Sequence, residues 1–118
     1  MNKIIIMGYL GQNAEHKMVG ENHLVSMSVA TSKWSKKDNK AVSTWHRVNV
    51  WGKAAEKYDK LVKGARVLIE GEYLGRTYTK KDGGEAYIME IHTWTAPIVV
   101  NAADSKPATQ ETDEFAIF

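Results

Sequence analysis

Residues 44–53 read Thr-Trp-His-Arg-Val-Asn-Val-Trp-Gly-Lys, and the fold can be built outward from them. Side chains of a β-strand alternate between the two faces of a sheet. His46, Val48 and Val50 therefore share one face, and the two valines can enter a core. The opposite face carries Trp45, Arg47, Asn49 and Trp51. The pattern predicts a strand with one buried face and one face that displays rings and a cation.

Two indoles with a guanidinium between them suit a surface that stacks flat rings and neutralises phosphates. A sheet that only needs to fold gains little from placing such residues on its outer face. The alternative is that one or both tryptophans cover the core or lie in a subunit contact. The pair with Arg47 between them favours the binding surface.

The chain before this stretch predicts two strands. Residues 3–10 begin apolar and β-branched and contain Gly8, which predicts a first strand bent at a glycine. Residues 15–19 are a candidate continuation of it. Residues 24–31 alternate between apolar and small polar side chains, which predicts a half-buried second strand. The residues of this strand expected to face the core are Val25, Met27 and Val29.

A polar loop is expected at residues 33–40, with four lysines and with Trp34 near its base. After the central strand, the apolar spacing predicts one helix over residues 53–63. Gly64 follows this helix, where a C-terminal cap belongs. The apolar stripe of the helix would consist of Ala54, Ala55, Tyr58, Leu61 and Val62.

Two more strands are predicted after the helix. Residues 65–79 form a long strand interrupted at Gly71 and Gly75, residues 80–85 form a hairpin loop, and residues 86–95 form the fifth strand. The residues of the fifth strand expected to face the core are Tyr87, Met89 and Ile91.

Five strands with a helix between the third and the fourth are the element order of the OB-fold, a small all-β Greek-key barrel. Residues 1–100 are therefore predicted to form one OB-fold domain, and residues 101–118 a flexible acidic tail. The tail has one basic and four acidic side chains, whereas the first hundred residues have 15 basic and 10 acidic ones. A basic body with an acidic tail indicates a polyanionic ligand, although solubility alone could explain the charges.

Several classes of protein are disfavoured by the composition. The absence of cysteine removes disulfides and thiolate metal sites, and the apolar run at residues 4–7 is too short for a signal peptide or a membrane span. We therefore expect a cytoplasmic protein that does not act on membranes. The four histidines lack metal-ligand spacing, the acids are scattered, and no nucleophile motif or phosphate loop occurs. We expect no enzyme, no metal and no cofactor.

At this point the residues resemble a known family, the bacterial single-stranded DNA-binding proteins. Residues 2–12 resemble its opening strand, with an apolar run and Gly-x-Leu-Gly, and residues 30–32 close the second strand as in that family. Residues 44–53 resemble its most specific segment, and residues 63–71 complete the pattern. The resemblance covers residues 2–95, with the motifs in order.

The resemblance implies an OB-fold homotetramer around which single-stranded DNA wraps during replication, recombination and repair. The stacking roles fall to Trp34, Trp45, Trp51 and Tyr78. The family often has Phe at the position of Trp51 and Trp at that of Tyr78, and both exchanges keep a π-face. The residues expected to contact phosphates are Lys3, Lys33, Arg47, Lys53 and Arg76. His46 stands at a position that the family uses at a subunit contact. Three roles are possible for Trp94: it lies in the binding groove, lies in a subunit interface or covers the end of the barrel.

The last residues of the chain resemble the acidic, Phe-ended tip with which the family docks replication and repair enzymes. The residues carried over to this partner-binding role are Asp113, Glu114, Phe115, Ile117 and Phe118. Ile117 stands where the family usually has proline. The alternative for the tip is a solubilising tail. The rival for the whole chain is an OB-fold RNA-binding or primosome-accessory module, which would have no reason to carry such a tip. A more distant rival is a structural adaptor that uses the tryptophan face for protein contacts.

Overall fold

The computed structural model describes residues 1–58 and 61–101 of the chain. The order of elements within these residues is β1 (Ile4–Leu10), β2 (Glu15–Val19), β3 (Asn22–Ser35), β4 (Lys40–Trp51), α1 (Lys53–Tyr58), β5 (Arg66–Thr79), β6 (Glu85–Thr93) and β7 (Ile98–Asn101). Apart from one short helix, the regular secondary structure of the described residues is therefore all β. No helix in this part of the chain is long and apolar enough to cross a membrane.

The strands form a sheet that closes on itself. Their order is β1-β3-β4-β6-β5, and β1 pairs again with β5, so that the first and last strands of this series are neighbours. The pairs are antiparallel except for β4 and β6, which run parallel over three residues from Val48 opposite Ile91. Closure through the first strand, with a parallel contact between the central strand and β6, is consistent with an OB-fold.

Gly8 lies where the barrel closes. β1 pairs with β5 from Ile4 to Tyr9 and with β3 at Tyr9 and Leu10. Close to Gly8, β1 therefore changes its pairing partner from β5 to β3. A Cβ at Gly8 would lie 2.1 Å from the carbonyl oxygen of Ala30. Only glycine lets the two backbones approach this closely. The expected glycine in the first strand thus has a packing role.

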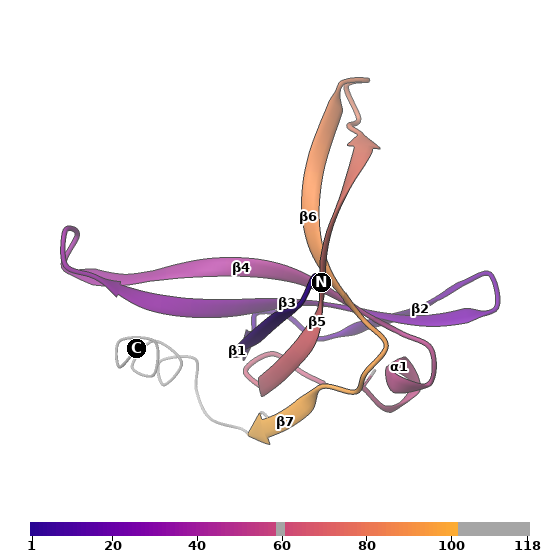
Figure 1. The fold of residues 1–118 in the computed structure, drawn as a ribbon, viewed down its shortest axis with the longest axis horizontal. Coiled ribbons are helices and arrows are strands. Elements are labelled where there is room, and N and C mark those ends of the chain that lie inside the picture. The colour runs from indigo at the N-terminus through magenta and orange to yellow at the C-terminus, as the bar shows by residue number, and fades with distance from the viewer. Residues whose placement is uncertain (59–60, 102–118) are drawn as a thin grey trace.

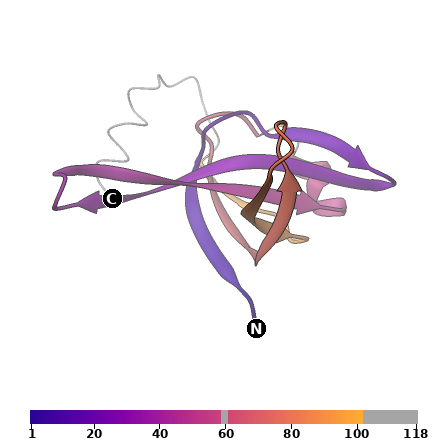
Figure 2. The same cartoon turned by 90° about the horizontal axis from the view of Figure 1, so that it is seen from above.

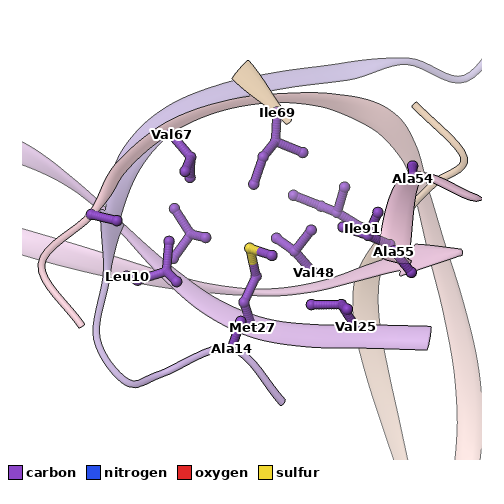
Figure 3. Close-up of a cluster of buried hydrophobic side chains, with 13 residues drawn as sticks. Leu10, Ala14, Val25, Met27, Val48, Ala54, Ala55, Val67, Ile69 and Ile91 are labelled. Carbon is purple, nitrogen blue, oxygen red and sulfur yellow. The ribbon is translucent and has the colours of Figure 1, made fainter. Parts of the chain in front are cut away.

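The core fills the closed barrel (Figure 3). Val25, Met27 and Val29 of β3 are buried, as their alternation predicted, and Val48 and Val50 of β4 are buried opposite them. The other members of this cluster are Leu10, Ala14, Ala54, Ala55, Ala65, Val67, Ile69 and Ile91. Burial of each larger aliphatic side chain contributes about 1.5–3 kcal/mol to the hydrophobic stabilisation.

Two long hairpins extend from the barrel as arms (Figure 1). The β3–β4 arm comprises residues 31–44, and its strands pair as far as Ser35 opposite Lys40. The β5–β6 arm comprises residues 72–90, and its strands pair as far as Thr79 opposite Glu85. In Figure 2 the β5–β6 arm is seen nearly end-on while the β3–β4 arm stays extended, so the two arms point in different directions. Half of the predicted polar loop at 33–40 is therefore strand, and residues 36–39 form the turn that closes the arm.

The predicted core face of the fifth strand is correct only at its base. Ile91 is buried, but Tyr87 is 70% exposed and Met89 is also exposed. The reason is that β6 pairs with both β4 and β5 at Ile91, whereas farther out it pairs with β5 alone. That part of the strand lies in the arm, where neither face is covered by another sheet. The prediction for Tyr87 and Met89 was wrong.

Three other predicted boundaries differ. β2 does not continue β1; it forms a hairpin with β3 through Gly20, whose φ is +63°. α1 ends at Tyr58, the predicted helical residues 59–60 lie outside the described residues, and Val62 is exposed. The helix is shorter because the chain turns back to β1, where the Gly64 amide donates to the carbonyl of Leu10 at 2.9 Å. β5 runs through Gly71 and Gly75 without interruption.

Candidate nucleic-acid interface

One face of the β3–β4 hairpin carries a row of rings and a cation. Trp45 lies opposite Ala30, Arg47 lies opposite Ser28, and Trp34 lies opposite Ala41. Residues that face one another in an antiparallel pair share a face, and alternate residues of each strand return to it. Trp34, Trp45 and Arg47 therefore share one face, which the sequence predicted for Trp45 and Arg47. Both indoles are exposed, Trp45 at 60%.

The Trp45 ring lies over the backbone at Gly11. A Cβ at Gly11 would lie 2.3 Å from Cζ3 and 2.4 Å from Cη2 of the indole. The glycine thus provides the space that lets this ring lie against the backbone beside β1. An indole supported in this way is held in place for stacking before any ligand arrives.

Trp51 is less open than the sequence suggested. Its Nε1–H donates to Nδ1 of His92 at 3.0 Å, and its ring is stacked against His92 with centroids 6.2 Å apart. It is also stacked against Trp94, with centroids 6.4 Å apart and planes 19° apart. Trp51 is half-buried in this group, whereas Trp94 is 62% exposed. Trp94 therefore offers more free ring surface than Trp51.

A buried carboxylate lies between the two arms. Glu90 of β6 is only 2% exposed, and its Oε1 accepts a hydrogen bond from Nε of Arg76 at 2.7 Å. Nη1 of Arg47 lies 3.8 Å from Oε2, and Nε2 of His92 lies 3.4 Å from Oε1. One acid thus holds the guanidinium groups of β4 and β5 together.

Glu90 also explains why the side-chain amide of Asn49 is not exposed beside the rings. Asn49 was expected between the indoles at the surface, but it is buried. Its Oδ1 accepts a hydrogen bond from Oγ of Ser26 at 2.9 Å, and its side chain also hydrogen-bonds Glu90. Asn49 therefore belongs to the network that carries the arginines, and the expectation of an exposed amide was wrong.

The charges of this network stabilise one another. Burial acts to raise the pKa of Glu90, but the hydrogen bond and the positive charge of Arg76, with hydrogen bonds from Asn49 and His92, outweigh it and lower this pKa. The hydrogen bond to Glu90 and its negative charge raise the pKa of Arg76. Both arginine side chains are still about half exposed, at 53% for Arg47 and 52% for Arg76. Their outer N–H groups can therefore bind an anion.

The chain's family follows from one comparison. A model of the single-strand binding protein family matches residues 1–97. The chain belongs to this family. The family consists of non-enzymatic proteins that bind single-stranded DNA, so single-stranded DNA is the ligand class of this chain.

The β5–β6 arm adds a ring and a cation to the interface of this family member. Arg76 and Tyr78 have the same parity on β5, and the guanidinium carbon of Arg76 lies 5.9 Å from the centroid of the Tyr78 ring. Tyr78 is partly exposed on the outer part of the arm. The predicted pairing of charge and ring on this strand is thus present in the geometry.

The three predicted phosphate-binding lysines lie in different surroundings. Lys3 forms an ion pair with Glu70 of β5. Lys53 is exposed at the start of α1. Lys33 is exposed but lies opposite Val42, so that alternation places it on the face of the β3–β4 arm away from Trp34. The structure therefore does not bring Lys33 together with the rings.

His46 lies on the face of β4 away from Trp45, as strand alternation predicted, and its role in a subunit contact stays a prediction. It is half-buried opposite Val29, and its Nε2 lies 3.0 Å from Oγ1 of Thr31. Burial lowers the pKa of His46, which favours the neutral ring.

A polar hollow of about 220 Å³ lies beside Arg47. It is bordered by the loop after β1 and by the hydroxyl-bearing face of β3, and its lining residues are Gln12, Asn13, Glu15, Ser26, Met27, Ser28 and Arg47. A guanidinium, serine hydroxyls and amides can hydrogen-bond a sugar, whereas the negative charge of Glu15 disfavours a phosphate within the hollow.

Sequence reasoning left the role of Trp94 open and missed that Glu90 and His92 join the same group. Strand alternation along residues 90–94 places these three residues on one face, and that was the available signal. Their role depends on the parallel register that sets Asn49 opposite His92, which the sequence does not reveal. The structure also brings His16 and His23 together across the β2–β3 hairpin, with Nε2 and Nδ1 2.8 Å apart. Among the described residues no group of three or more His, Cys, Asp or Glu side chains can hold a metal ion.

Proposed function

We propose that the chain binds single-stranded DNA without sequence preference and protects it during replication, recombination and repair. Membership of the single-strand binding protein family gives the ligand class. The observation that carries the mechanism is that the exposed rings of Trp34 and Trp45 share a face with Arg47, whose guanidinium lies 3.8 Å from the buried Glu90 carboxylate.

Stacking explains both why binding does not depend on sequence and why it favours single strands over duplex DNA. Every base has a π-face, and stacking on an aromatic side chain contributes about 1–3 kcal/mol per base whatever the sequence. A duplex hides those faces between its own base pairs, so it gains only the phosphate contacts. Arg47, Arg76, Lys3 and Lys53 would supply these contacts by releasing counterions. The expected result is a strong preference for single strands.

Titration of tryptophan fluorescence with oligo-dT, a matched duplex and poly-U tests this proposal. We expect deep quenching by oligo-dT and little by the duplex at moderate salt, because only the single strand can stack. Equal affinity for the duplex would contradict the stacking mechanism. Tighter binding of poly-U than of oligo-dT would instead favour the alternative, an OB-fold RNA-binding or primosome-accessory module.

A pair of variants locates the surface. Trp45→Ala should weaken binding of a fluorescently labelled oligo-dT by about 1–3 kcal/mol. Tyr87→Ala is the matched control, because Tyr87 is equally open but lies on the other face of the β5–β6 arm from Arg76 and Tyr78. Its affinity should stay near that of the unaltered chain. Anisotropy titrations measure both, and a larger loss for Tyr87→Ala would move the interface to the opposite face.

We propose that the chain assembles into a homotetramer. Several apolar side chains are exposed on the outer surface of β1 and β7, namely Ile5, Met7, Ile98 and Val100. Met7 and Ile98 both lie opposite Leu68 of β5, on either side of it, so they belong to one apolar strip. Such a strip supports a contact between subunits. Sedimentation equilibrium measures the mass, and a monomer at micromolar concentration would contradict the assembly.

We also propose that the acidic tip docks replication and repair proteins in the cytoplasm, and that the chain catalyses no reaction itself. The tip residues Asp113, Glu114, Phe115, Ile117 and Phe118 lie outside the described residues, so this proposal rests on the resemblance alone. Deletion of residues 113–118 should leave or slightly strengthen DNA binding and abolish capture of partner enzymes. Capture that survives the deletion would remove the docking role from the tip.

A further inference from the structure

Trp94 lies just beyond β6 and presents an indole with one supported side and one open side. One side is stacked on Trp51, whose N–H is tied to Nδ1 of His92 at 3.0 Å. The ring is nevertheless 62% exposed, so much of its surface remains free. A flat ring held from one side and open on the other is the arrangement that a stacking platform needs.

A hollow of about 340 Å³ lies beside this ring. Its walls are residues 1–3 at the start of the chain, residues 70–72 of β5 and residues 92–95. This volume is at the lower end of that of small-molecule sites, about 300–1,000 Å³. Two acidic residues, Glu70 and Glu72, line the hollow, and the one lysine in its lining, Lys3, already forms an ion pair with Glu70.

We propose that Trp94 is the platform of a further nucleotide subsite, in which a base of the bound single strand stacks on the indole and occupies this hollow. The inference rests on the proposed binding of single-stranded DNA. The two carboxylates disfavour a phosphate in the hollow, whereas they can accept hydrogen bonds from the N–H groups of a base edge. The subsite therefore takes the base and leaves the phosphate outside.

The subsite is continuous with the surface described above. Trp94 contacts Trp51, Trp51 is bound to His92, and Nε2 of His92 lies 3.4 Å from the Glu90 carboxylate that holds Arg76. The path from the arginines to the hollow thus runs through side chains in contact. A strand that leaves Arg47 along β4 would meet Trp51 and then Trp94.

Trp94→Ala and Trp94→Phe in the full chain test the subsite, with Trp45→Ala as the reference for one lost platform. Binding of a labelled oligo-dT is followed by anisotropy over a range of salt concentrations. We expect Trp94→Ala to weaken binding about five- to a hundredfold, the range that one stacked base contributes, and Trp94→Phe to retain most of the affinity. The slope of log affinity against log salt should not change, because no phosphate contact is lost.

The outcomes separate this inference from the proposed function. Normal affinity for Trp94→Ala beside a loss for Trp45→Ala would overturn the subsite and leave the proposed function intact. Normal affinity for both variants would overturn the subsite and also the stacking role of Trp45 in the proposed mechanism. A changed salt slope, or a changed sedimentation coefficient with unchanged affinity, would overturn the subsite and make Trp94 a phosphate-positioning or subunit-contact residue.

Trp94→Ala could weaken binding indirectly, by removing the ring on which Trp51 is stacked. A measurement on the unaltered chain avoids this ambiguity. Oligonucleotides with 5-iododeoxyuridine at successive positions are irradiated in the complex, and the crosslinked residue is identified by peptide fragmentation. We expect a crosslink at Trp94 from one position of the strand. Crosslinks at Trp34 or Trp45 with none at Trp94 from any position would overturn the subsite.

Discussion

A buried carboxylate is costly unless cations and hydrogen bonds surround it. Glu90 meets this condition with Arg76, Arg47 and His92 as neighbours of its two oxygens and with Asn49 beside it. In return it fixes the guanidinium of Arg76 by a hydrogen bond and attracts that of Arg47 at 3.8 Å, so both move less freely. Fixed groups lose less side-chain entropy when they bind an anion. The acid thus assists binding of a polyanion, although its own charge has the wrong sign.

The lowered pKa of Glu90 predicts a loss of stability in acid. The unfolded chain takes up a proton near the ordinary value of 4.5, before the folded chain does. The stabilisation from Glu90 is therefore complete above that value and is lost as the pH falls through the lower pKa of the folded state. Urea unfolding between pH 7 and pH 3 measures it, with Glu90→Gln as the comparison.

Glu90→Gln should be less stable at pH 7 by about 1–3 kcal/mol, because the arginines lose their charged partner. The difference between the two proteins should shrink toward pH 3. His46 also destabilises the fold on acidification, since burial lowers its pKa, but it contributes equally to both proteins and cancels in the difference. A constant difference over the whole range would show that Glu90 is not charged at neutral pH.

Gly11 gives a second prediction, in which binding and stability separate. Gly11→Ala should weaken binding of single-stranded DNA by up to about 1–3 kcal/mol, because the new methyl group must displace the Trp45 ring. Stability should change little, since the group that moves is the end of a side chain. Anisotropy titration and thermal unfolding measure the two effects.

Gly20→Ala is the matched control for Gly11→Ala. Gly20 lies in the β2–β3 hairpin with φ at +63° and open space around it. The substitution should destabilise the fold by about 1–2 kcal/mol through the left-handed backbone and leave DNA affinity unchanged. The reverse pattern in the two variants would contradict the support of Trp45 by Gly11.

At the scale of elements, alternation within a strand was predictable and the surroundings of each strand were not. The face shared by Trp45 and Arg47 and the buried face with Val48 and Val50 follow from period two alone. Tyr87 obeys the same alternation, but its strand has left the barrel at that position and only one neighbour remains. Where a strand leaves a barrel is fixed by pairing between distant segments, which no local pattern reveals.

The lysine-rich segment shows the same limit. A run of polar residues from 33 to 40 reads as a loop, yet residues 33–35 pair with residues 40–42 as strand. The pairing also decides which side chains join the rings: it places Trp34 with Trp45 and turns Lys33 to the other face. The residue types were visible in the sequence, whereas their grouping came from the register.

At the scale of the molecule, the grouping of the rings with Arg47 on one face of the β3–β4 hairpin predicts which charges govern the salt dependence of DNA affinity. Arg47→Gln should reduce the slope of log affinity against log salt by about 0.7, the contribution of one phosphate contact to a single strand. Lys33→Gln removes the same charge from the opposite face of the hairpin and should leave the slope near that of the unaltered chain. Equal changes in both slopes would mean that the strand contacts both faces of the β3–β4 arm.

Beyond the buried Glu90, the outer parts of the two arms have both of their faces in solvent, while the core is enclosed by the remaining strands (Figure 1). Backbone amides of the arms should therefore exchange with deuterium through small local openings, and those of the barrel only through global unfolding. Trp34 and Tyr78 stand on the parts that open most readily. A DNA strand bound along an arm should suppress these local openings. DNA should therefore slow deuterium exchange in the arms far more than in the barrel, and the complex gains rigidity where the free protein has least.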